Sequence, residues 1–120
     1  MKREVKQLEI KDVSGQEVIF QVQDILYALI NNNILTIYLE FDVVVTQMSL
    51  KSFASMLPID KFAKPHNSYL ISLEKIEVIR GKHIFLKNKS KVRSGEELLH
   101  ITQEFAKEFR HKYEIFKQNN

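Results

Sequence analysis

A basic segment in the second half of the chain is the group of side chains best suited to bind a ligand. From Arg80 to Arg93 six residues are basic and none is acidic, and Asn88 and Ser90 add hydrogen-bond donors. The six are Arg80, Lys82, Lys87, Lys89, Lys91 and Arg93. Such a segment can hold the phosphates of a polyanion, but an exposed edge strand protected from aggregation by lysines would have the same composition. Taken alone, the segment favours neither interpretation.

A polar interruption upstream favours the polyanion. Lys64, His66 and Asn67 stand between two apolar stretches. Pro65 has no N–H and disfavours helix at the residue before it, so we expect a strand to end here. Residues 69–73 then alternate in the pattern of a new strand. The turn between the two strands would present its polar side chains to base edges, while the basic segment supplies charge for phosphates.

The histidines are the only residues that suggest a metal site. The chain has four histidines and no cysteine, which excludes disulfides and cysteine-based zinc sites. His100 and His111 fall near one helical face together with two glutamates, but Lys107 and Lys112 are interleaved with them. This pattern is typical of a solvated, salt-bridged face and not of converging ligands. We therefore expect neither a metal nor another cofactor.

His66 and Ser68 are the residues that come nearest to a nucleophile and its base. Residues two apart on a strand lie on one side of it, but no third group is positioned to orient the base. The sequence also lacks a phosphate-cradling glycine loop and the H-E-x-x-H motif. We therefore expect a binding protein and not an enzyme.

Composition indicates one soluble domain with a basic second half. The 120 residues, 44% of them apolar and 28% charged, are enough for a single domain, 1–120, with its own core. No apolar run is long enough to span a membrane and no signal sequence opens the chain, so we expect a cytoplasmic protein without membrane insertion. Residues 1–47 hold four basic and seven acidic side chains, whereas residues 48–120 hold fourteen and eight. Polyanion binding therefore belongs to the second half.

Hydrophobic periodicity predicts a mainly β fold with about eight to ten short strands. Besides the two strands that flank residues 64–67, strands are predicted at 5–10, 17–22, 24–30, 34–41, 42–45, 75–80 and 83–86. The three asparagines at 31–33 predict a tight turn, because asparagine tolerates the left-handed backbone that such turns require. No internal repeat is visible.

Two segments have helical spacing instead. A short helix is expected at about 49–57, with Ser49 as its cap and Pro58 as its stop. The helical period returns at Leu98, and a C-terminal helix is expected at about 102–117.

The stretch from Phe62 to Leu73 resembles the signature of the LytTR DNA-binding domain, a family of bacterial transcriptional regulators. It fits the pattern F-x-x-x-H-[R/N]-S-Y-L-[I/V]-x-L. Segments on both sides follow the family's order, among them the paired strands around residues 31–33 and the helical segment within 99–109. The resemblance covers about residues 16–117. It implies small stacked antiparallel sheets whose loops enter successive major grooves of duplex DNA.

The resemblance also implies roles for individual residues. The residues expected to read bases are Asn33, His66 and Asn67. The residues expected to hold phosphates are Lys64, Lys87, Lys89, Lys91 and Arg93. The chain departs from the family at Thr102-Gln103, where a Ser-Arg pair commonly opens the last helix and its arginine contacts DNA. Gln103 can still pair with adenine, but it carries no charge.

The expected partner is double-stranded DNA, with promoter direct repeats as the target and a homodimer as the bound form. The alternative is a protein-interaction module that keeps the fold but binds a regulatory protein or a second copy of itself. The missing arginine and the modest net charge of +3 support that alternative. A receiver domain usually precedes the family's domain and is not part of this sequence. The chain is therefore either a free-standing regulator or a piece of a longer one.

Overall fold

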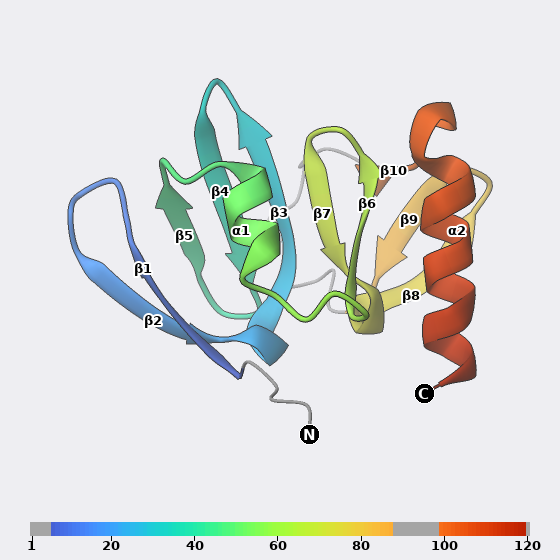
Figure 1. The fold of residues 1–120 in the computed structure, drawn as a ribbon, viewed down its shortest axis with the longest axis horizontal. Helices are drawn as coiled ribbons and strands as arrows, with labels where there is room; N and C mark the ends of the chain where they lie inside the picture. Colours follow the sequence, from blue (N-terminus) through green and yellow to red (C-terminus); the bar gives the residue numbers. More distant parts are fainter. Residues whose placement is uncertain (1–5, 88–98, 120) are drawn as a thin grey trace.

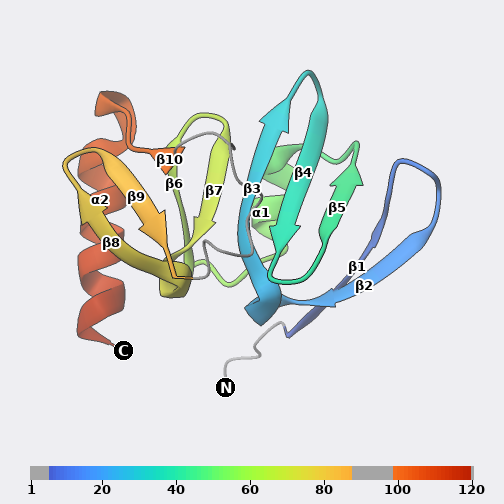
Figure 2. The same cartoon turned by 180° about the vertical axis from the view of Figure 1, so that it is seen from behind.

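The computed structural model describes residues 6–87 and 99–119, which form three antiparallel sheets with two α-helices (Figures 1 and 2). The described strands are β1 (Gln7–Lys11), β2 (Glu17–Gln21), β3 (Ile25–Asn31), β4 (Ile34–Leu39), β5 (Val43–Thr46), β6 (Phe62–His66), β7 (Tyr69–Ser72), β8 (Ile76–Arg80), β9 (His83–Leu86) and β10 (Leu99–His100). The helices are α1 (Leu50–Ser55), α2 (Gln103–Gln118) and two 3-10 helices, η1 (Val22–Asp24) and η2 (Leu73–Lys75). The predicted mainly β fold with small antiparallel sheets, one short helix and a C-terminal helix is confirmed.

A five-stranded sheet in the order β5-β4-β3-β7-β6 separates two hydrophobic cores. One core joins the sheet to the β1–β2 hairpin and to α1, where Phe53 is fully buried. The other joins the sheet to the three-stranded sheet β10-β9-β8 and to α2, where Phe109 is buried. Strand β3 serves both cores, since Ala28 lies in the first and Leu26 in the second. The middle of the sheet is therefore covered on both faces. The turns at its strand ends are the parts of the sheet that a ligand could reach.

The three asparagines form the predicted tight turn. Asn31 pairs with Ile34, so Asn32 and Asn33 alone connect β3 to β4. Their φ angles are 51° and 65°, the left-handed conformation at both turn positions. A two-residue turn of this kind matches the right-handed twist of the strands it joins. The sequence identified both the turn and the reason for its composition.

Strand β6 passes through Pro65, so the prediction of a strand end at Lys64 is wrong. The strand continues to His66, with a register shift between Ala63 and His66. Because β6 is the edge of its sheet, the missing N–H of proline costs no interstrand hydrogen bond there. The Pro65 carbonyl is also occupied, since it accepts a hydrogen bond from the Thr102 N–H at 3.0 Å. A proline ends a central strand but is tolerated at an edge with a bulge.

The two α-helices lie close to the predicted positions. Helix α1 is shorter than predicted, but Ser49 caps it as expected, with its Oγ accepting from the Ser52 N–H at 3.0 Å. Helix α2 begins at Gln103. The predicted helical period begins at Leu98, whereas Leu99 and His100 form strand β10 against β9. A two-residue strand is too short to have a period of its own, so the helical spacing of the neighbouring residues concealed it.

Two parts of the chain share a local arrangement that the sequence did not reveal as a repeat. Helix η1 leads into the β3–β4 hairpin and η2 leads into the β8–β9 hairpin, and a register shift follows the first residue of each hairpin. After each hairpin the next N–H bonds back to the 3-10 helix: Glu40 to the Asp24 carbonyl at 2.9 Å, and Lys87 to the Lys75 carbonyl at 2.8 Å. An ion pair between Glu40 and Lys75 connects the two units.

Candidate nucleic-acid interface

The two turns that carry predicted base-reading residues lie side by side at one end of the five-stranded sheet, the upper edge in Figure 1. Strands β3 and β7 pair antiparallel, so the β3–β4 turn and the β6–β7 turn leave the sheet at the same end. The Ile30 N–H donates to the Ser68 carbonyl at 3.0 Å and ties the turns together. Asn33 and Asn67 are both exposed. Pairing between distant strands thus places two amides on one edge.

His66 is the last residue of β6 and leads into the β6–β7 turn. Its ring stacks on Tyr69, with 4.4 Å between centroids, and meets His100 edge-on at 4.9 Å. Its Nδ1 accepts the Ser68 N–H at 3.0 Å, so this nitrogen carries no proton. The half-buried imidazole therefore shapes the turn that presents Asn67, and a base-reading role would have to coexist with that structural one.

Gln103 is brought to the same edge by the start of α2. Thr102, the residue before the helix, does not cap it with its side chain. Its N–H and its hydroxyl instead both donate to the Pro65 carbonyl, at 3.0 and 3.4 Å. This contact fastens the helix start beside the end of β6, and Gln103 is exposed there.

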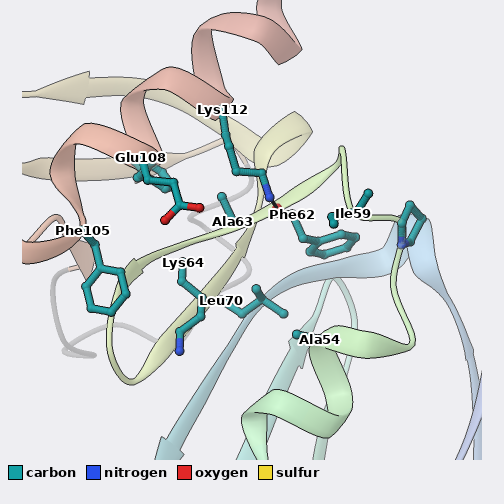
Figure 3. Close-up of a pocket in the computed structure, with 11 residues that line it drawn as sticks. Ala54, Ile59, Phe62, Ala63, Lys64, Leu70, Phe105, Glu108 and Lys112 are labelled. Carbon is teal, nitrogen blue, oxygen red and sulfur yellow. Dashed lines mark hydrogen bonds between the residues drawn. The ribbon is translucent and has the colours of Figure 1, made fainter.

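Lys64 lines a groove between α1 and α2 (Figure 3). The groove has a volume of about 220 Å³ and an apolar floor that includes Phe62 and Leu70. The Lys64 ammonium lies 5.6 Å from the centre of the Phe105 ring, within range of a cation–π contact. Lys64 therefore lies beside the turn edge, and its charge is partly engaged by an aromatic ring.

Known proteins share both the sequence pattern and the fold of this chain. The sequence profile of the LytTr DNA-binding domain family matches residues 15–114. The chain belongs to this family. Among solved structures, the fold is similar to the LytTr DNA-binding domain of a protein described as a putative methyl-accepting/DNA response regulator from Bacillus cereus, with a TM-score of 0.68 over 89% of this chain and 95% of that one. The two sequences are 19% identical, so this likeness shows a shared fold. No curated protein matches the sequence.

Family membership confirms the predicted LytTR resemblance and makes the chain a LytTr DNA-binding domain. The profile leaves the contact residues open, since it does not assign them. The edge that carries the β3–β4 turn, the β6–β7 turn and the start of α2 offers the candidates in this LytTR domain.

The described part of the basic segment is divided between the two ends of the β8–β9 hairpin. Lys87 follows β9 and lies near Lys75, at the end of the hairpin opposite to its turn. Lys82 lies in the β8–β9 turn itself, close to Gln103. Lys82 was not among the predicted phosphate contacts. The turn chemistry of Gly81-Lys82 was the sequence signal that could have separated Lys82 from the rest. Lys89, Lys91 and Arg93 lie outside the described residues and stay predictions.

The described residues offer no metal site. Within residues 6–87 and 99–119, no group of three His, Cys, Asp or Glu side chains is placed to hold a metal ion. Neither described α-helix is long and apolar enough to cross a membrane.

Proposed function

We propose that this LytTR domain binds duplex DNA sequence-specifically, as the DNA-binding part of a bacterial transcriptional regulator. We further propose that it reads bases with one edge, formed by the β3–β4 turn, the β6–β7 turn and the start of α2. We call this the reading edge and define it by Asn33, Asn67 and Gln103. The observation that carries the proposal is that backbone hydrogen bonds bring three exposed residues, from three separate parts of the chain, to one edge of the molecule.

The shape of the reading edge suits a DNA groove. The major groove of B-DNA is about 12 Å wide and admits a helix or a two-stranded ribbon. Each of the two turns is the tip of a two-stranded hairpin with only two connecting residues. Such a tip can enter the groove without displacing the sheet behind it.

The chemistry of the reading edge predicts which bases it selects. All three side chains are primary amides, and a primary amide pairs through two hydrogen bonds with N6 and N7 of adenine. None of the three carries a charge, so the edge specifies bases while other residues must supply the attraction to phosphates. We therefore expect adenines at the contacted positions, with Lys64, Lys87, Lys89, Lys91 and Arg93 as the predicted phosphate contacts.

A selection experiment tests the proposal and finds the target sequence at the same time. The protein is incubated with a library of random duplexes, bound sequences are enriched, and affinity for the enriched site is compared with that for a scrambled duplex. We expect specific binding to exceed non-specific binding at physiological salt by at least about 10³-fold. Equal retention of all duplexes, or none, would contradict the proposal.

A matched pair of variants then tests the reading edge. Asn67→Ala is expected to cost about 1 to 3 kcal/mol on the enriched site and scarcely to change binding to scrambled DNA. Gln23→Ala is the control, because Gln23 is an exposed amide at the opposite end of β3 from the Asn32–Asn33 turn. Equal effects of the two variants would place Asn67 outside the interface.

The number of copies on DNA and the alternative function are tested with the same material. Two copies on promoter direct repeats is the expected bound form, and mass measurement of the complex on one and two half-sites distinguishes it from a single copy. A DNA-bound regulator would act in the cytoplasm, where promoters are. If no duplex is enriched, the alternative of a module that binds a regulatory protein becomes the better account.

A further inference from the structure

The β8–β9 turn is fixed by two hydrogen bonds from the segment that ends in α2. The Arg110 guanidinium donates to the Gly81 carbonyl at 2.8 Å, and the Ile101 N–H donates to the Lys82 carbonyl at 2.7 Å. Gly81 has a φ of +60°, a left-handed conformation that glycine adopts without strain. Both carbonyls of this two-residue turn are therefore held, and its one charged side chain, Lys82, is exposed.

The turn is also placed against the reading edge. Lys82 and Gln103 line the same surface cavity, and His100 lines it with them. His100 in turn meets the ring of His66 beneath the β6–β7 turn. Lys82 thus lies beside the start of α2.

The charge of Lys82 is available at this position. Lys82 takes part neither in the Lys75–Glu40 ion pair nor in the Lys117–Glu114 ion pair. Glu104 is exposed in the first turn of α2 and would repel a phosphate, so a cation is needed close by. A lysine acts toward phosphate as a mobile point charge, which suits a contact that fixes position without reading sequence.

We propose that Lys82 contacts a backbone phosphate beside the base pair that Gln103 faces, and that Arg110 is a positioning residue that holds the Lys82 turn in place. This inference rests on the proposed function. It assigns to a neighbouring turn the positive charge that Gln103 does not provide.

The salt dependence of binding tests this contact. On the enriched duplex, Lys82→Ala is expected to reduce the slope of log K against log salt by about 0.9, the loss of one phosphate contact. Lys82→Arg keeps the charge and should keep the slope. Lys117→Ala is the control, since it removes the same charge from an exposed lysine about 21 Å along α2 from Gln103.

Arg110 requires a double variant, because an exposed guanidinium could touch DNA itself. If Arg110 acts through the Lys82 turn, the double variant Lys82→Ala/Arg110→Ala should have the slope of Lys82→Ala alone. A further loss of about 0.9 in the double variant would make Arg110 a direct phosphate contact and overturn its positioning role. Thermal melting of each variant identifies any that fails to fold. Arg110→Met then replaces Arg110→Ala, since methionine keeps an apolar stem but removes both the charge and the donors to the Gly81 carbonyl.

The outcomes separate this inference from the function on which it rests. If the unaltered protein enriches no duplex, the proposed function fails. If it binds specifically but Lys82→Ala has the same salt slope as Lys117→Ala, the function stands and the Lys82 contact is overturned.

Discussion

The β3–β4 and β8–β9 hairpins have the same framework but different tips. Each follows a 3-10 helix, has a register shift after its first residue and is closed by a hydrogen bond back to that helix. The first tip is Asn32-Asn33, with both residues left-handed, whereas the second is Gly81-Lys82, with only the glycine left-handed. One tip therefore carries neutral amides and the other a cation.

The two tips also differ in the elements that surround and hold them. The β3–β4 tip extends from the middle of the five-stranded sheet and is tied to the neighbouring β6–β7 turn. The β8–β9 tip belongs to the outer sheet and is fixed by Arg110 of α2. The comparison shows that the framework determines where a tip lies, while the two turn residues determine whether it can read a base or hold a phosphate.

The largest expected effect is on the connection between the two hairpin units. The Glu40 and Lys75 side chains are only 18% and 13% exposed, so removing Lys75 takes away the charge that offsets a largely buried carboxylate. We expect Lys75→Met to lower the free energy of unfolding by about 2 kcal/mol. The double variant Glu40→Gln/Lys75→Met should lose less free energy of unfolding than the sum of the losses in the two single variants. Additive losses in urea unfolding would show that the pair does not couple the units.

The next effect separates the shape of the first tip from its chemistry. Asn33→Gly keeps the left-handed turn, because glycine adopts a φ of 65° without strain, but removes the amide. We expect normal folding and a loss of about 1 to 3 kcal/mol on the enriched duplex, with little change on scrambled DNA. Asn32→Gly makes the same backbone change at the other turn position and serves as control. A loss of equal size in both variants would mean that the turn backbone, and not the Asn33 amide, matters.

A smaller effect is expected from giving the start of α2 a positive charge. Gln103→Arg should raise the affinity for DNA and steepen the salt slope by about 0.9, the gain of one phosphate contact. If Lys82 already occupies that phosphate, the gain should be larger in the Lys82→Ala background than in the unaltered protein. Binding titrations at several salt concentrations measure both. An unchanged slope in both backgrounds would place position 103 off the DNA.

The smallest effect concerns the β1–β2 turn, which lies outside the compared units. The Ser14 hydroxyl donates to the Asp12 carboxylate at 2.6 Å and lowers the pKa of Asp12. The ionised form is thus favoured in the folded protein, so its contribution to stability is present above about pH 4, the ordinary value, and is lost as the pH falls through the lowered pKa. We expect the difference in melting temperature between the unaltered protein and Asp12→Asn to shrink below that pH. If the difference in melting temperature stays constant with pH, the charge of Asp12 does not contribute to stability.

Local features of this protein were determined by its sequence. The Asn31–Asn33 turn, the cap at Ser49 and the C-terminal helix follow from backbone preferences and side-chain period, which depend on neighbouring residues alone. The sequence was misleading at Pro65 and at residues 99–100, because the effect of a proline depends on whether its strand is an edge, and a two-residue strand exists only through its partner.

Only the tertiary structure decided which of the predicted residues meet. The period of a strand tells which face a side chain occupies, but not which other strand lies beside it. Antiparallel pairing of β3 with β7 placed Asn33 near Asn67, and the Thr102–Pro65 contact added Gln103. The direction of β9 placed Lys82 beside them and Lys87 at the far end, although both belong to one basic segment. Contacts between residues far apart in the chain depend on the order of strands in the sheets, which no local pattern specifies.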